Sequence, residues 1–116
     1  MSTYNPDLWV MLKISSDKYP TVYKILASWY GGYLNGDSWK MNSGVTEVTE
    51  DGDFYNFKGS SGSVYRCHKN GYRMSGYTSG VFASFQKDME SDEAKSINAV
   101  MELLPETTNF MELPYA

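Results

Sequence analysis

The segment Trp29-Tyr30-Gly31-Gly32-Tyr33-Leu34-Asn35-Gly36-Asp37-Ser38-Trp39 combines four aromatic rings with three glycines. Large rings favour burial, while glycine permits positive φ angles and close approach of the backbone. Asn35-Gly36 is a strong turn signal, because both residues tolerate the left-handed conformation that a tight hairpin turn needs. We therefore expect a strand to turn here. Its rings are expected either to fill a corner of the core or to form a surface for an aromatic ligand or a partner.

Two stretches before this turn have the features of strands. Residues 8–14 alternate in polarity, which predicts a strand with one side toward the core. We expect that side to carry Leu8, Val10, Leu12 and Ile14, with Trp9, Met11 and Lys13 on the other. Residues 21–30 also fit a helical stripe, but their β-branched and aromatic side chains favour a strand. Because Gly31-Gly32 follows, we predict a strand that pairs with the first one.

The middle of the chain contains three turn signals between short strand-like runs. They are Asp51-Gly52-Asp53, the run Gly59 to Ser63, and Asn70-Gly71. Turn signals at this spacing describe an antiparallel meander. The strands that we predict, after a short strand at 38–41, are residues 44–50, 54–57, 64–68 and 72–75.

The apolar residues then change to a helical period. A helix after Ser79-Gly80 is indicated by Val81, Phe82, Phe85 and Met89. Ser91 is a good N-cap, and Pro105 is expected to end a helix over 92–104. That helix would carry an apolar stripe of Ile97, Val100, Met101 and Leu104. We predict one α+β domain over residues 1–116, with a single antiparallel β-meander sheet of about five or six strands and one or more C-terminal helices packed on it.

The single cysteine, Cys67, excludes an internal disulfide framework. No charged-then-apolar leader opens the chain, and its apolar runs are shorter than the roughly 20 residues of a membrane helix. We therefore expect no membrane partner and a cytoplasmic location, which is the host cytoplasm if the protein is viral.

Charge is segregated along the chain, although the net charge is only −4. Residues 44–53 hold four acids, residues 54–87 hold five cations and no acid, and residues 88–116 hold seven acids against one lysine. These segments are expected either to lie side by side and neutralise one another, or to form two faces that steer different partners.

The residue types that carry catalysis are scarce. Cys67 and His68 are the only cysteine and histidine, and neighbours on a strand point to opposite faces, which disfavours a nucleophile pair. We expect Cys67 to be buried beside an exposed His68. Asp51-Gly52-Asp53 lacks the frame of a calcium loop, and Gly59 to Ser63 lacks the ending of a Walker loop. We therefore predict no enzyme activity, no cofactor and no metal.

Cations interleave with aromatic rings in residues 58–77. This pattern is typical of surfaces that neutralise phosphates and stack bases, but it also fits a solvated strand face paired with acids elsewhere. The candidate partner-binding residues are Tyr65, Arg66, Lys69, Tyr72, Arg73, Tyr77, Tyr33 and Trp39.

Four short motifs stand between residues 20 and 80: Trp29-Tyr30-Gly31-Gly32-Tyr33, Ser38-Trp39, Asn42-Ser43-Gly44 and Ser61-Gly62-Ser63-Val64-Tyr65. Through them the region loosely resembles small uncharacterised proteins of large tailed bacteriophages. The resemblance names no characterised family, so no functional residue carries over from it. The compact, acidic composition rich in Tyr and Met also resembles phage proteins that bind and inhibit a host factor.

Two functions from different classes follow. The first is a non-catalytic protein-binding protein, encoded by a phage, that inhibits a host or anti-phage defence protein. It rests on the scarcity of catalytic residues and on the surplus of Tyr, Trp and Met, which interfaces favour. The alternative is a nucleic-acid or nucleotide binding module that uses residues 58–77. Exposed strand edges also make a homodimer conceivable.

Overall fold

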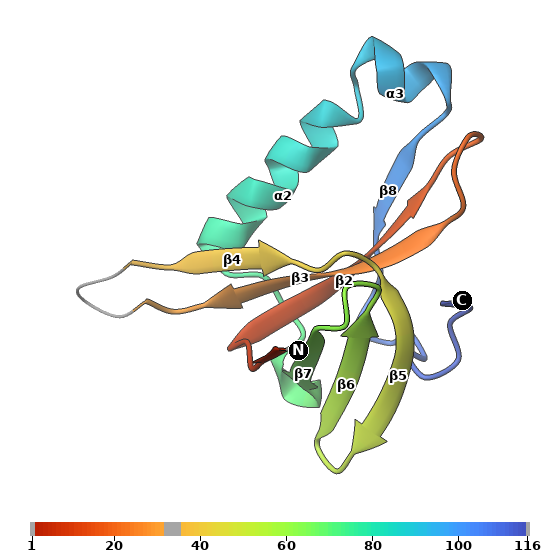
Figure 1. Cartoon of the computed structure of the whole chain (residues 1–116). Coiled ribbons are helices and arrows are strands. Elements are labelled where there is room, and N and C mark those ends of the chain that lie inside the picture. Colours follow the sequence, from red (N-terminus) through yellow and green to blue (C-terminus); the bar gives the residue numbers. More distant parts are fainter. Residues whose placement is uncertain (1, 32–35, 116) are drawn as a thin grey trace.

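The computed structural model describes residues 2–31 and 36–115, and these residues form two four-stranded sheets and two α-helices (Figure 1). Sheet A has the strand order β1-β7-β6-β5, and sheet B has the order β4-β3-β2-β8. The elements are β1 (Thr3–Tyr4), β2 (Leu8–Ser15), β3 (Val22–Trp29), β4 (Ser38–Met41), β5 (Val45–Asp51), β6 (Phe54–Gly59), β7 (Val64–His68), the 3-10 helix η1 (Lys69–Gly71), α2 (Gly76–Asp88), α3 (Asp92–Ser96) and β8 (Val100–Leu103).

The strands predicted between residues 8 and 68 are confirmed. Residues 22–29 are a strand and pair antiparallel with β2, as their β-propensity indicated. The meander β5-β6-β7 is antiparallel throughout, and Gly52 has φ 57° in the first of its turns. The Asn35-Gly36 turn signal lies partly outside the described residues.

The single predicted sheet is wrong, because the strands divide between two layers. Sheet A lies against one face of sheet B, and α2 lies across the other face (Figure 1). β2 is therefore buried on both faces. The expectation that Trp9 and Met11 point away from the core is also wrong, since they are 1% and 0% exposed.

The larger core lies between the two sheets. Trp9 is its centre, because its ring contacts those of Phe57 and Phe110 with centroids 5.3 and 5.2 Å away. Its Nε1 donates a hydrogen bond of 2.7 Å to the carbonyl of His68. The buried members of this core are Trp9, Met11, Tyr23, Ile25, Ala27, Val45, Phe57, Tyr65, Cys67, Leu104 and Phe110.

The smaller core lies between sheet B and α2. Its buried members are Val10, Leu12, Leu26 and Phe82. Only Thr78 and Phe82 of α2 are buried, so this helix covers the sheet with a narrow strip of side chains.

Residues 72–75 are not the predicted return strand. Tyr72 makes one isolated parallel bridge to Trp9, and α2 then begins at Gly76, earlier than the position after Ser79-Gly80. A capping box explains this start: the Thr78 N–H donates to Ser75 Oγ, and the Ser75 N–H donates to Thr78 Oγ1.

The predicted helix over 92–104 is also wrong. Only Asp92–Ser96 is helical, and residues 100–103 form β8, which pairs antiparallel with β2. Asn98, at φ 52°, occupies the left-handed region and reverses the chain between the two elements. The helices therefore lie between β7 and β8 in the sequence, not at the C-terminus. No helix in residues 2–31 or 36–115 is long and apolar enough to cross a membrane.

Candidate functional site

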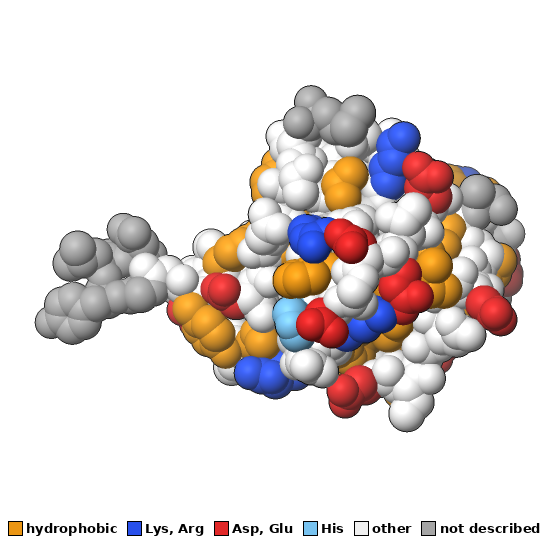
Figure 2. All heavy atoms as spheres, turned by 90° about the horizontal axis from the view of Figure 1, so that it is seen from below, with side chains coloured by type: hydrophobic (Ala, Val, Ile, Leu, Met, Phe, Trp, Pro, Cys, Tyr) orange, Lys and Arg blue, Asp and Glu red, His pale blue; other side chains and the backbone are white. Residues whose placement is uncertain are grey.

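Three cations of the predicted basic surface, Lys58, Arg66 and Lys69, pair with acids of β5 at sheet A. Arg66 Nη1 is 3.0 Å from a carboxylate oxygen of Asp51, and Lys58 Nζ is 3.6 Å from one of Glu47. Lys69 binds Glu50, and this hydrogen bond raises the pKa of the lysine. Figure 2 shows positive and negative side chains interspersed over the face that it draws. The neutralisation account is therefore supported for these cations, with β5 supplying the acids.

Two of the candidate partner-binding tyrosines lie inside the protein. Tyr65 is 1% exposed in the core between the sheets, and burial raises its pKa to about 12. Tyr72 is half-buried, and its ring packs edge-on against Trp9 at 4.7 Å between centroids. The Tyr72 hydroxyl accepts a hydrogen bond from the Met11 N–H at 3.1 Å and donates one to the Leu104 carbonyl. Neither ring is available to stack on a partner.

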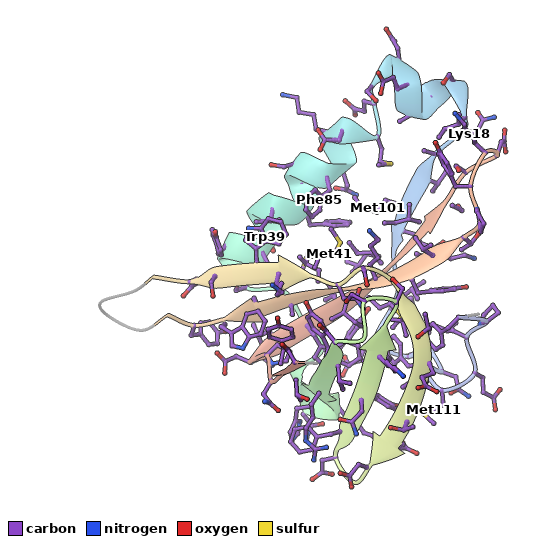
Figure 3. All side chains as sticks on the ribbon, in the orientation of Figure 1. Lys18, Trp39, Met41, Phe85, Met101 and Met111 are labelled. Carbon is purple, nitrogen blue, oxygen red and sulfur yellow. The ribbon has the colours of Figure 1, made fainter. Side chains whose placement is uncertain are left out.

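The other candidates are separated on the surface. Arg73 lies between η1 and α2, Tyr77 lies in the first turn of α2 and is 45% exposed, and Trp39 lies on β4. Trp39 packs edge-on against Phe85 of α2 at 5.5 Å between centroids (Figure 3). Among the described residues no ring contact or ion pair joins Arg73, Tyr77 and Trp39. The remaining candidate, Tyr33, lies outside the described residues.

The described rings of the segment 29–39 divide between the two expected locations, the core and the surface. Trp29 is half-buried against the larger core, and its Nε1 donates to the Asn5 carbonyl at 3.0 Å. Tyr30 and Trp39 are exposed instead. One ring of this segment therefore supports the core, and two lie on the surface.

Cys67 and His68 have opposite environments, as strand alternation predicted. Cys67 is 0% exposed, and burial raises the pKa of its thiol, which disfavours the reactive thiolate. His68 is half-buried on the outer face and not exposed as expected; its Nδ1 accepts a hydrogen bond from the Asn70 N–H at 3.0 Å. In the described part of the chain no three His, Cys, Asp or Glu side chains gather in a way that could hold a metal ion.

A concave surface lies where no site was predicted, at the end of sheet B beside α3. Three adjoining hollows of about 480, 430 and 240 Å³ meet there, and Ala99 lines all three. We call this region the Ala99 corner. It is formed by Lys18, Tyr19, Asp88, Met89, Ser91, Glu93, Ala94, Ser96 and Ile97 in the first hollow, by Gln86, Met89, Glu90, Val100 and Met101 in the second, and by Ile14, Ser15, Ser16, Tyr19, Pro20, Val22, Lys24 and Ile97 in the third.

Hydrogen bonds between segments distant in the sequence fix the shape of the Ala99 corner. Asn98 Nδ2 donates to a carboxylate oxygen of Asp17 at 2.6 Å, and the Asp17 N–H donates to the Ile97 carbonyl at 2.7 Å. The Ala99 N–H donates to the Ala94 carbonyl at 2.9 Å. These bonds hold the β2–β3 loop against the turn that leads from α3 into β8.

Exposed apolar side chains surround the Ala99 corner. Tyr19 is 60% exposed and Val100 is 54% exposed, and both line hollows. Val22 and Leu103 are exposed as well. Sequence reasoning missed this surface because it assigned residues 97–104 to a helix. Asn98, a residue that tolerates the left-handed conformation, was the signal for a turn there.

Comparison of the chain with protein-family models, with curated proteins and with solved structures found no significant match.

Proposed function

We propose that this protein is a non-catalytic protein-binding protein whose contact surface is the Ala99 corner together with β8. One observation carries the proposal: four of its large apolar side chains, Tyr19, Val22, Val100 and Leu103, are exposed around this end of sheet B. Register relates two of them through β2, because Ile14 lies opposite Val22 of β3 and the next residue, Ser15, lies opposite Val100 of β8. Apolar patches that stay exposed beside concave surfaces are typical of protein contacts.

The surroundings of the other candidate residues support the same assignment. The hypothesis of nucleic-acid binding was based on the cations and rings of residues 58–77. Three of those cations form ion pairs with acids of β5 in sheet A. Two of the rings, Tyr65 and Tyr72, are engaged inside the protein. Catalysis by a thiolate is disfavoured by the burial of Cys67.

The identity of the partner rests on the phage resemblance alone. On that basis we propose a host or anti-phage defence protein as the partner, inhibition as the outcome, and the host cytoplasm as the place of action. A bacterial lysate is therefore the appropriate source for a capture experiment.

The test compares three immobilised proteins: the wild type, a Val100→Glu/Leu103→Glu variant, and Met111→Glu as a control. Met111 is 39% exposed and lies far from β8, beside sheet A (Figure 3). We expect the wild type and the control to retain the same lysate protein in stoichiometric amount, and the β8 variant to lose it, because buried carboxylates without partners oppose binding. Failure of the wild type to retain any protein stoichiometrically would contradict the proposed function. Equal retention by all three would place the contact on another surface.

A further inference from the structure

The four sheet edges differ in how well they are protected against pairing with another strand. In sheet A, β1 has two residues, and β5 carries paired acids and an irregularity of register between Val45 and Glu47. In sheet B, β4 carries Lys40, whose ammonium lies 5.1 Å from the centre of the Tyr4 ring. Short strands, bulges and lysines are the usual protections of an edge. β8 has four residues with neither a lysine nor an irregularity of register; its one charged residue is Glu102, and it carries exposed Val100 and Leu103.

The backbone of β8 has groups available on its outer side. Leu104 donates its N–H to the Met11 carbonyl, so the pair Met11/Leu104 bonds across the strands. Bonding pairs alternate along an antiparallel ladder, which directs the N–H and C=O of Met101 and Leu103 away from β2. β8 is the last strand on this side of sheet B, so in the described part of the chain no neighbouring strand takes up these groups.

Room for side chains lies directly beside this edge. The hollow of about 430 Å³ between the end of α2 and β8 is lined by Gln86, Met89, Glu90, Ala99, Val100 and Met101. A strand added to β8 would direct alternate side chains to the two faces of sheet B. Those on the helix side would lie next to this hollow, where the apolar groups of Met89, Val100 and Met101 stand beside the polar side chains of Gln86 and Glu90.

The hollows beside β8 are mainly acidic. Asp88, Glu90 and Glu93 line the two larger ones, against one cation, Lys18. Glu102 is exposed on β8 itself, opposite Lys13 of β2, and these two residues form no ion pair. Lys24 lines only the third hollow. All three ion pairs among the described residues use acids of β5, so none of the acids from Asp88 to Glu112 is neutralised by one. This edge is complementary to a segment that carries Lys or Arg.

The same charge argues against a second copy of this chain as the occupant. Two copies paired through β8 would bring two acidic segments together, with Glu102 and the acids around the hollows of each copy near those of the other. Like charges across paired strands destabilise the pairing. A basic segment of a different protein meets no such repulsion.

We propose that β8 receives an extended segment of a partner protein, with Lys or Arg alternating with apolar residues, as an additional strand of sheet B. Main-chain hydrogen bonds to Met101 and Leu103 supply the pairing, and the acids around the hollows select basic side chains. This inference rests on the proposed function, since it specifies how the partner is bound.

The probe is a fluorescent synthetic peptide of alternating Lys and Val, compared with a Glu-Val peptide and with a Lys-Val peptide N-methylated at alternate residues. We expect the Lys-Val peptide to bind, to bind less tightly in added salt, and to shift the NMR amide signals of Met101 and Leu103. The N-methylated peptide should bind at least about tenfold more weakly, because it lacks the donors that pair with the edge. The Glu-Val peptide should not bind.

Three variants locate the contact. Leu103→Pro removes one outward N–H without removing a bond to β2, and Glu102→Lys reverses a charge on the strand. Each should weaken peptide binding by about tenfold or more. Glu112→Lys makes the same charge change outside β8 and should retain binding. Circular dichroism establishes that each variant is folded, and the N-methylated peptide tests the pairing even if Leu103→Pro does not fold.

Several results would overturn the inference. Equal binding of the Lys-Val and Glu-Val peptides contradicts selection by charge, and equal binding of the N-methylated peptide contradicts strand pairing. A concentration-dependent dimer that Glu102→Lys strengthens identifies a second copy as the occupant. If a lysate protein is retained through Val100 and Leu103 but no basic peptide binds, the inference fails while the proposed function stands.

Discussion

The Tyr72 hydroxyl completes the hydrogen bonding between β2 and the residue that follows β8. It lies between the Met11 N–H and the Leu104 carbonyl, accepting from the first and donating to the second. These two groups belong to one bonding pair of the ladder, in which Leu104 N–H already donates to Met11. One side chain from the connection between η1 and α2 thus joins the strand that both cores share to the end of β8.

We expect Tyr72→Phe to lower the free energy of unfolding by about 1–3 kcal/mol, because the buried Met11 N–H and Leu104 carbonyl lose their partner. Urea unfolding followed by tryptophan fluorescence measures this. Tyr77→Phe is the matched control, since Tyr77 is 45% exposed and should change stability by about 0.5 kcal/mol or less. Equal stabilities of the two variants would show that the Tyr72 hydroxyl contributes nothing.

Single residues also show what the sequence could establish. Alternation along residues 64–68 placed Cys67 inside, and the same alternation places Tyr65, two positions earlier, on the same buried face. Tyr65 was nevertheless predicted to lie on the surface, because cations interleave with aromatic rings in residues 58–77. Tyr72 follows no strand pattern, so its burial depends on contacts with β2 that lie about 60 positions away in the sequence.

At the scale of elements, α2 is held to sheet B by few buried side chains. Of its residues only Thr78 and Phe82 are buried, and Gly80 lies in its second turn. Glycine within a helix lowers its stability by roughly 1 kcal/mol relative to alanine. By contrast, β2 has five consecutive buried residues and strands on both sides.

We therefore expect the amides of α2 to exchange with solvent through local opening, well before those of β2 and β3. Native-state hydrogen exchange followed by NMR measures both at increasing urea concentrations. The α2 amides should show low protection with little dependence on urea, and the β2 amides should exchange only on global unfolding. Equal protection of α2 and β2 would show that the helix unfolds only together with the rest of the protein, and that the narrow contact through Phe82 is sufficient for this.

The mistaken helix over 92–104 has a physical explanation. Ile97, Val100, Met101 and Leu104 have the spacing of a helical face, but their elements differ: Ile97 caps α3, and the other three belong to or follow β8. The helical spacing of apolar residues does not show whether the chain reverses its direction between them. Two features favour a strand over a helix for residues 100–103. Asn98 adopts the left-handed conformation, which ends the helical segment, and β2 offers its edge in sheet B for these residues to pair with.

At the scale of the whole molecule, the sequence predicted which segments pair locally but not that they form two layers. Each hairpin and the meander follow from turn signals close to their strands. The stacking of sheet A on sheet B depends on Trp9, Phe57 and Phe110, which come from three distant segments. A near-continuous apolar run in residues 8–12 was the signal for a strand buried on both faces.

The buried tyrosines predict how the stability of the whole molecule depends on pH. Burial raises the pKa of Tyr65 and of Tyr72 to about 12, and it also raises the pKa of Tyr115. In the unfolded chain these groups titrate near the ordinary value of about 10. Their neutral forms therefore contribute stability that is complete below about pH 10 and is lost as the pH rises toward 12.

We expect the urea midpoint to change little with these groups up to about pH 10 and to fall steeply above it. Tyr72→Phe, which removes one titrating group, should show a shallower fall than Tyr77→Phe. Unfolding curves in buffers across this range measure the effect. A midpoint that is constant from pH 10 to 12 would contradict the assignment of these hydroxyls to the interior.

The position of β2 within both cores determines when the chain can complete its structure. Residues 8–15 are synthesised long before β8 and Phe110, which pack against them. Tyr115 contacts Met11 across 104 positions of the chain. Contacts between residues so far apart in sequence slow folding, because a long loop must close before they form. Until β8 and Phe110 have left the ribosome, the apolar faces of β2 therefore lack their final partners, and the nascent chain depends on its local hairpins to keep them from intermolecular contacts.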